Sequence, residues 1–192
     1  MVSRSRNLLL LASLGLLAAG ALAWAGPLTG VAHANACHRY GDTPPPRLSN
    51  EQARRAVRCL LNRKRRSHGL GGLHANGRLE KAAQNHTRYM TQHNCFSHEC
   101  SGEPSVLARL MKVNYIVGGL TRWSFGENIA WGGGGRGKPR KIVRAWMHSP
   151  GHRANILSPQ FDEIGIGFRT GYPGSPKADG GTYTTDFGMR HR

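Results

Sequence analysis

Two segments decide the fold class of this chain: Glu163-Ile164-Gly165-Ile166-Gly167-Phe168-Arg169 and Gly181-Thr182-Tyr183-Thr184-Thr185-Asp186-Phe187. Both contain the β-branched and aromatic residues that favour strands. The residues between them, 171–180, are rich in Pro and Gly, which is typical of a hairpin connection. Patterns typical of helices lie almost entirely on the N-terminal side of these segments. Helices early and strands late predict an α+β fold with an antiparallel sheet, rather than a doubly wound parallel sheet.

The clearest helical pattern begins at Ser49, the first residue of a capping-box sequence. Apolar residues at helical spacing follow, so a helix is predicted to about Ser67. The other face of this helix carries seven cations: Arg54, Arg55, Arg58, Arg63, Lys64, Arg65 and Arg66. That face could meet phosphates, or it could be the solvated side of an amphipathic helix.

Further elements follow along the chain. A second helix capped by Asn76, a third over about residues 104–112 and a fourth ending near His148 are predicted. His86, on the apolar face of the second helix, is expected to be a packed core residue rather than a ligand. A strand is expected around residues 128–130, and the glycine tract 132–137 is expected to be a mobile loop.

The first 36 residues have the layout of a secretory signal peptide. Arg4 and Arg6 precede an uncharged apolar run over residues 8–25, and small residues with Ala-x-Ala patterns follow it. The run is just long enough to span a bilayer, so an uncleaved N-terminal anchor is the alternative. Residues 37–48, with three consecutive prolines, are expected to form an extended arm, and residues 49–190 a single domain. The protein is therefore expected to be secreted.

All four cysteines follow the predicted signal segment. An even number of cysteines in an exported chain predicts two disulfides, for which three pairings can be drawn. Only four residues separate Cys95 from Cys100, so a local bridge there is the simplest choice, and it leaves Cys37 to pair with Cys59. A zinc cluster is the alternative, although the CxxC spacing is missing.

The chain is strongly basic, with 27 Lys and Arg against 10 Asp and Glu in 192 residues and a formal net charge of +17. Such an excess attracts polyanions. In an exported chain the expected partner is an anionic membrane or cell-wall surface. Nucleic acid is not an expected partner, because the sequence contains no known nucleic-acid-binding motif. Residues 132–138 match the spacing of a phosphate-binding loop, but Pro139 stands where Ser or Thr would bind Mg²⁺. We therefore expect no nucleotide site. Separately, the protein is expected to be a monomer.

Three short motifs keep a fixed order along the chain. His98 follows Phe96-Ser97, Glu127 lies in Gly126-Glu127-Asn128-Ile129-Ala130, and His152 lies in the segment from Trp146 to Leu157. Together with Asn62 and Gly69-Leu70, this order resembles the CAP superfamily, also called SCP-like or the cysteine-rich secretory, antigen 5 and pathogenesis-related 1 group. The shorter pattern of this chain is similar to that of the bacterial branch.

The resemblance implies an α-β-α sandwich around a small antiparallel sheet, with a shallow open cleft lined by His98, Glu127 and His152. The second acid of the family pattern would fall on Ser149, three residues after Trp146. Because serine cannot supply that carboxylate, any mechanism that needs two carboxylates is weakened. Related proteins have been associated with sterol or lipid binding, so a lipid or an envelope component is the ligand that the resemblance implies.

The chemistry of these three side chains allows two functions. Neutral imidazoles of His98 and His152 could bind a divalent cation such as Zn²⁺, with Glu127 as a third ligand or as a group that orients water. Glu127 is then the one candidate catalytic residue, a general base for a metal-assisted extracellular hydrolase or protease. Without catalysis the same residues form a polar binding cleft. We favour a non-enzymatic module that binds lipid or cell-envelope components, with the hydrolase as the alternative.

Overall fold

The two C-terminal strand segments pair with each other in antiparallel orientation, as predicted. They are β3 (Glu163–Thr170) and β4 (Gly180–His191) in the computed structural model, which describes residues 36–191. Strand β2 (Arg122–Gly133) pairs antiparallel with β4 along its whole length, and the two-residue β1 (His74–Ala75) adds to β3 in parallel. The sheet order is β1-β3-β4-β2, so β2 is an edge strand.

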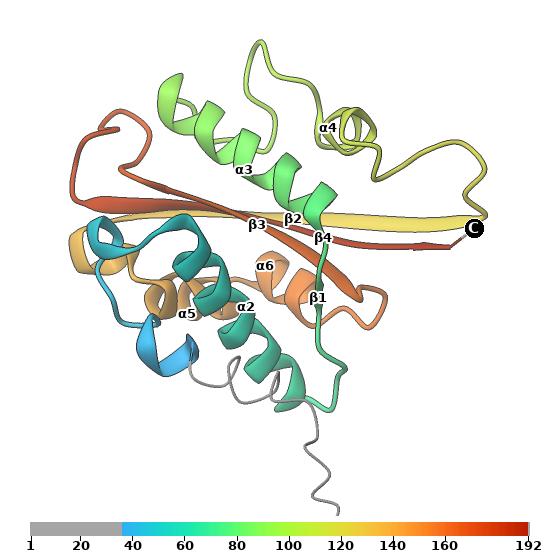
Figure 1. The fold of residues 1–192 in the computed structure, drawn as a ribbon, viewed down its shortest axis with the longest axis horizontal. Coiled ribbons are helices and arrows are strands. Elements are labelled where there is room, and N and C mark those ends of the chain that lie inside the picture. Colours follow the sequence, from blue (N-terminus) through green and yellow to red (C-terminus); the bar gives the residue numbers. More distant parts are fainter. Residues whose placement is uncertain (1–35, 192) are drawn as a thin grey trace, which may run out of the picture.

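Helices cover both faces of this sheet and make a three-layer α-β-α sandwich (Figure 1). Helices α3 (Gly77–Gln92) and α4 (Val106–Lys112) lie on one face. Helices α2 (Asn50–Arg66), α5 (Pro139–His148) and α6 (Pro150–Ile156) lie on the other. Short 3-10 helices η1 (Pro45–Arg47) and η2 (Gly134–Gly137) precede α2 and follow β2. The predicted fold class is confirmed.

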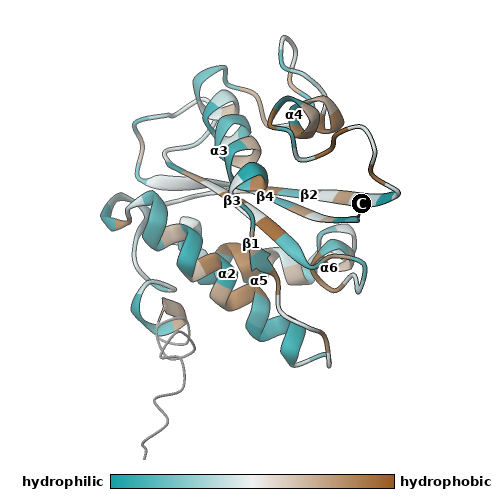
Figure 2. Cartoon of the chain, turned by 45° about the vertical axis from the view of Figure 1, so that its right-hand side comes forward, coloured by the Kyte–Doolittle hydropathy of each residue, from teal (hydrophilic) through white to brown (hydrophobic). Residues whose placement is uncertain are grey.

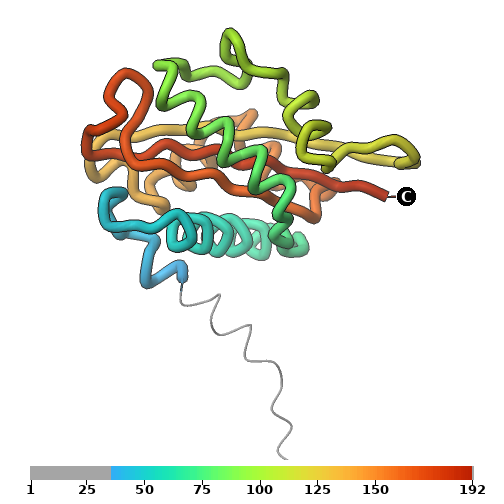
Figure 3. The backbone as a smooth tube through the Cα atoms, turned by 45° about the horizontal axis from the view of Figure 1, so that its top comes forward, coloured from blue at the N-terminus to red at the C-terminus, as the bar shows by residue number. Residues whose placement is uncertain are grey.

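Two glycines of β3 let α3 pack directly on the sheet, and Figure 3 shows this helix crossing the strands. A Cβ atom at Gly165 would lie 2.0 Å from the carbonyl carbon of Leu79, and one at Gly167 would lie 2.3 Å from the carbonyl oxygen of Ala83. Since no side chain fits in this space, the alternation of isoleucine and glycine in β3 sets the distance between helix and sheet.

The main hydrophobic core lies between the sheet and the layer of α2, α5 and α6. Apolar residues at helical spacing on α2, among them Ala53, Val57 and Leu61, are fully buried there. Hydrophilic residues make up most of the remaining surface of this helix (Figure 2). The predicted capping box is formed, because Ser49 Oγ accepts from the backbone N–H of Gln52 and Gln52 Oε1 accepts from that of Ser49.

The prediction for the cationic face of α2 is wrong for Arg65, whose exposed fraction is only 3%. Its guanidinium donates hydrogen bonds to the backbone carbonyls of Gly71, Ile156, Ser158 and Phe161. Arg65 thus ties the end of α2 to the segment that follows α6, and it is not available to a ligand.

The expected extended arm is also wrong in part, because Pro45–Arg47 form η1. Ala36, Cys37 and Leu48 are buried in the main core. Both predicted disulfides are confirmed, Cys37–Cys59 and Cys95–Cys100, and the alternative of a cysteine zinc cluster is excluded because every described cysteine is bridged. The first disulfide attaches the arm to α2.

Two other segments differ from the sequence-based expectation. The glycine tract is the end of β2 followed by η2 rather than a loop without regular structure, and its two ends are closely packed, because a Cβ at Gly137 would lie 2.5 Å from the carbonyl oxygen of Gly132. Helix α6 was not expected, although Pro150 occupies the first turn, where proline is favoured. Within residues 36–191 no helix combines the length and apolar character needed to cross a bilayer. Except for Ala36, the predicted signal segment lies outside the described residues.

Candidate functional site

The edge strand β2 carries Glu127 into a nearly closed environment, where its side chain is 2% exposed. Both carboxylate oxygens have a close partner. Oε1 accepts from His98 Nδ1 at 2.8 Å, and Oε2 accepts from Arg109 Nη2 at 2.6 Å. His98 comes from the loop that follows α3, and Arg109 comes from α4. His98 and Glu127 are therefore in contact, as predicted, and the buried Arg109 binds the other carboxylate oxygen of Glu127.

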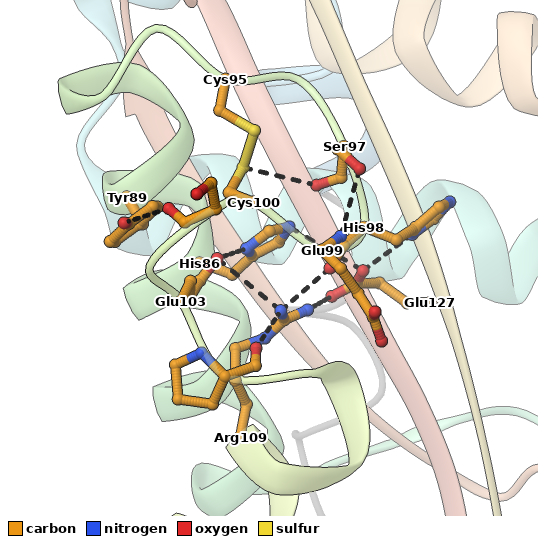
Figure 4. Close-up of a disulfide and its surroundings, with 12 residues drawn as sticks. His86, Tyr89, Cys95, Ser97, His98, Glu99, Cys100, Glu103, Arg109 and Glu127 are labelled. Carbon is orange, nitrogen blue, oxygen red and sulfur yellow. Dashed lines mark hydrogen bonds and ion pairs between the residues drawn. A yellow bond between two sulfur atoms is a disulfide. The ribbon is translucent and has the colours of Figure 1, made fainter.

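Glu127 belongs to a buried charge cluster, which we define as His86, Glu103, Arg109, Glu127 and Asp186; Figure 4 shows the first four of these residues. His86 Nδ1 lies 2.6 Å from Glu103 Oε2, and Arg109 Nη1 lies 3.7 Å from the same oxygen. In Figure 4 the Arg109 guanidinium lies between the two glutamates. His86 is fully buried, as expected, but it packs in this cluster rather than in an apolar core.

Asp186 lies opposite Glu127 on β4, in register with it. Its two carboxyl oxygens are buried and accept no hydrogen bond from an N–H or hydroxyl group within residues 36–191, so the neighbouring Glu127 carboxylate is the group with which Asp186 can share a proton. Burial raises the pKa of Asp186 well above its ordinary value, and the nearby negative charge of Glu127 raises it further. This shift favours the protonated form of Asp186.

The pKa of Glu127, in contrast to that of Asp186, is lowered. Burial alone would raise this pKa, but the His98 hydrogen bond and the charges of His86 and Arg109 outweigh that cost, so the pKa lies below its ordinary value. At neutral pH Glu127 is therefore a carboxylate held in place by cationic and N–H groups.

A short disulfide loop holds His98 at the surface. Cys95 and Cys100 close the loop, and Arg109 donates a hydrogen bond to the carbonyl oxygen of His98 at 2.9 Å. Although its Nδ1 bonds Glu127, the His98 side chain is 50% exposed. Nδ1–H donates to the carboxylate, so the Nε2 nitrogen carries the free lone pair. His98 is thus fixed in orientation and open to a ligand.

His152 reaches the same region from α6. Asn128, the neighbour of Glu127 on β2, donates to the carbonyl oxygen of His152 at 3.0 Å, and Asn155 donates to that of Glu127 at 3.2 Å. Burial lowers the pKa of His152, and the charge of His98 lowers it further, so the two imidazoles are close enough to repel when charged. His152 Nδ1 lies 2.7 Å from Ser149 Oγ.

Among the three predicted cleft residues, only the two histidines keep a ring nitrogen, Nε2, without a hydrogen-bond partner within residues 36–191. Among residues 36–191 no three His, Cys, Asp or Glu side chains are grouped to hold a metal ion. Each carboxylate oxygen of Glu127 already accepts one hydrogen bond, and Glu127 does not form a three-ligand group with the two histidines. His98 and His152 each have a partner at Nδ1, and metal-binding histidines are commonly oriented by such a bond at the other ring nitrogen.

Sequence reasoning missed Glu103, Arg109 and Asp186. The first two are single charges in a loop and a short helix, where charged residues are usually solvated. For Asp186 a signal was available, because a carboxylate between Thr185 and Phe187 interrupts a strand that is otherwise suited to burial.

Comparison with known proteins gives consistent matches. Residues 59–184 match the model of CAP, the cysteine-rich secretory protein family. The uncharacterized protein YkwD of Bacillus subtilis (strain 168) is 35% identical over 111 residues, which are 57% of this chain and 39% of that protein. The chain thus spans about two fifths of that relative.

Solved structures show the same architecture. An extracellular protein containing a SCP domain from Bacillus anthracis has a TM-score of 0.56 and 25% identity, over 72% of this chain and 40% of that chain. An outer surface protein from Borrelia burgdorferi has a TM-score of 0.54 and 20% identity, over 68% and 87% of the two chains. The second likeness concerns the fold alone.

Proposed function

This chain belongs to the cysteine-rich secretory protein (CAP) family, and we propose from that premise that it is an exported, non-enzymatic protein that binds lipid or cell-envelope components. Export is supported by the two disulfides, which persist in oxidising compartments, and by similarity to a solved protein described as extracellular. Binding to an anionic surface is supported by the formal net charge of +17.

The state of Glu127 is the observation that carries the non-enzymatic interpretation. A general base needs a free oxygen within reach of the proton it removes and a pKa near the working pH. Both oxygens of Glu127 already accept hydrogen bonds from cationic or ring N–H groups, and its pKa is lowered. Glu127 is therefore suited to hold His98 in position and poorly suited to accept a proton from water.

His98 and His152 are the groups through which the cleft would bind. Their Nδ1 atoms are held by Glu127 and Ser149, which leaves the Nε2 atoms for a divalent cation such as Zn²⁺ or for a polar ligand group. A bound cation would supply a Lewis acid centre for anionic ligand groups. Because two histidines are fewer than the three or four protein ligands of most zinc sites, we expect an open site of modest affinity.

The cation part of the proposal is tested by calorimetric titration of the purified protein with Zn²⁺. We expect one site in the native protein, lost in both His98→Ala and His152→Ala. His74→Ala is the matched control, because His74 is exposed on β1. Absence of zinc binding in the native protein, or equal binding in all variants, would show that the histidine pair holds no cation.

The same variants test the alternative, a metal-assisted hydrolase. Peptide and ester substrates are incubated with the native protein, with and without a chelator. Our proposal predicts no turnover above buffer. Turnover that disappears with the chelator and in His98→Ala would replace the binding function with the hydrolase.

Association with anionic surfaces is tested by sedimentation with vesicles that contain anionic lipid and with isolated cell walls. Each well-placed Lys or Arg contributes about 1 kcal/mol near such a surface, and salt screens this attraction. Binding at low salt and release at high salt are therefore expected. Association that does not change with salt would contradict the electrostatic part of the proposal.

A further inference from the structure

Two hollows lie on opposite sides of α5 and share Arg144 and His148 in their linings. The first, of about 480 Å³, lies between α5 and α2. The second, of about 590 Å³, lies between α5 and the end of β2 with η2, and Trp131 lines it. Neither contains His98, Glu127 or His152. We call the combined region the α5 surface.

The charge of the α5 surface is of one sign. No Asp or Glu lines either hollow. Five of its cations have no carboxylate within ion-pair distance among the described residues: Arg63, Lys64, Arg136, Lys141 and Arg144. Arg140 differs, because it pairs with Asp42 at 2.8 Å. All five free cations are exposed. A surface of this kind has uncompensated positive potential and attracts an anionic partner.

Aromatic rings border one end of this surface. Trp131 is 43% exposed and stacks on Tyr172, with ring centroids 4.6 Å apart and planes 15° from parallel. Phe96 meets Trp131 edge to face at 6.5 Å. The indole is therefore held by its neighbours while part of it stays in contact with solvent. The negative face of such a ring attracts the slightly positive C–H groups of a sugar ring.

We propose that the α5 surface binds an anionic polysaccharide, with Trp131 stacking on a sugar ring and the free cations pairing with its acidic groups. This inference rests on the proposed binding function and names the ligand class. A helix with its side chains is about 10 Å across, so cations on both sides of α5 match the repeated charges of a polymer better than a single lipid headgroup. Trp131 also lines a hollow, whereas a side chain that enters a bilayer must project from the surface.

The test measures binding of polygalacturonate oligosaccharides to the full chain. Lys141→Glu combined with Arg144→Glu should weaken binding by more than about thirtyfold, because thirtyfold is expected for the loss of two well-placed cations and the introduced carboxylates add repulsion. The control reverses two exposed cations on α3 and α4, Arg88→Glu with Lys112→Glu, and changes the net charge equally. If both double variants lose affinity equally, the α5 surface has no specific role and the inference fails.

Trp131→Ala tests the stacking. It should weaken polygalacturonate binding about tenfold and leave binding of inorganic polyphosphate, which has no sugar rings, unchanged. Trp123→Ala is the matched control, because Trp123 is 41% exposed on the same strand. Circular dichroism checks that each variant is folded. Equal effects of the two tryptophan variants, or equal loss for both polyanions, would overturn the sugar assignment.

Two further measurements separate this inference from the proposed function. His98→Ala should bind polygalacturonate as the native protein does, since its cleft lies outside both hollows. If Trp131→Ala instead lowers binding to anionic vesicles while polygalacturonate does not bind, the surface is a membrane contact and the polysaccharide inference is wrong. The proposed function would then stand.

Discussion

Replacing Arg109 by methionine tests whether the buried charge cluster holds the site together. Arg109 is 5% exposed and Glu127 is 2% exposed, so the pair is desolvated. Removing one partner of a buried ion pair costs about 3–5 kcal/mol, because the other charge is left without compensation. Arg109→Met also removes hydrogen bonds to the carbonyls of His98 and Pro104. We expect a loss in this range and a fall in Tm of about 10 °C or more.

The stability loss caused by Arg109→Met should depend on pH in a defined direction. In the native protein the pKa of Glu127 is lowered, so its ion pair stabilises the fold above the unfolded-state pKa of about 4.3 and loses that effect as pH falls through the lowered value. Without Arg109, burial dominates and Glu127 takes up a proton more readily. The difference in stability between native protein and variant should therefore be largest near neutral pH and should shrink as pH falls toward about 4.

Urea unfolding followed by circular dichroism, near neutral pH and near pH 4, measures both effects. The matched control is Arg88→Met, since Arg88 is exposed on α3 and bonds only Asn85 among the described residues. It should cost less than about 0.5 kcal/mol. If Arg109→Met costs no more than this control, or costs the same at both pH values, the argument that the cluster depends on Arg109 is refuted.

Three other substitutions test features of the fold. Asp186→Asn should stabilise the protein near neutral pH by about 1.4 kcal/mol for each unit by which folding raises the pKa of Asp186, because asparagine needs no proton in order to be buried in neutral form. The gain in stability should vanish below about pH 4, and a loss of stability near neutral pH would contradict this expectation. Removing the arm disulfide, by Cys37→Ser with Cys59→Ser, should cost about 3 kcal/mol in urea unfolding, since it closes a 22-residue separation; a cost near zero would show that the arm needs no covalent link. Gly165→Ala should cost about 3 kcal/mol, because its Cβ would lie 2.0 Å from the α3 backbone, whereas Gly71→Ala, with open space around it, should be nearly neutral; equal Tm values would refute close packing.

The sequence predicts the helices and strands best where periodicity and end signals agree. Helix α2 begins at its capping box, and α3 begins after Asn76, whose side chain accepts from the backbone N–H groups of Arg78 and Leu79. Strands β3 and β4 follow their β-branched residues. In each of these elements local propensity and tertiary packing favour the same structure.

The predictions that are wrong concern segments where packing overrides local preference. Pro45 is buried, and η1 packs against β4 and η2, so contacts made far along the chain bend an arm that consecutive prolines would extend. The glycine tract has no helical propensity, and its structure depends on close approach between Gly132 and Gly137. Helix α6 buries only Ile156 among its seven residues, so it lacks the apolar spacing that indicated the equally short α4.

For the candidate site, motifs could indicate which residues gather but not their protonation or their partners. The contact of His98 with Glu127 agrees with the resemblance, whereas the role of Glu127 depends on Arg109 and Asp186, which lie on other elements. Such pairings depend on tertiary structure and leave no spacing pattern in the sequence. The general-base hypothesis rested on a free carboxylate, and the structure gives that carboxylate two partners.

The buried charge cluster also bears on the surface of the molecule. It takes the side chains of three of the ten acidic residues, Glu103, Glu127 and Asp186, into the interior, where Arg109 pairs with the two glutamates. Carboxylates that are buried around His98 cannot neutralise the cations on the surface of the protein. Helix α5 itself carries no Asp or Glu. One distribution of acids therefore favours both an ordered His98 and the uncompensated cationic α5 surface. Ser149, at the position where the family pattern would place a second acid, instead holds His152, because its Oγ lies 2.7 Å from His152 Nδ1.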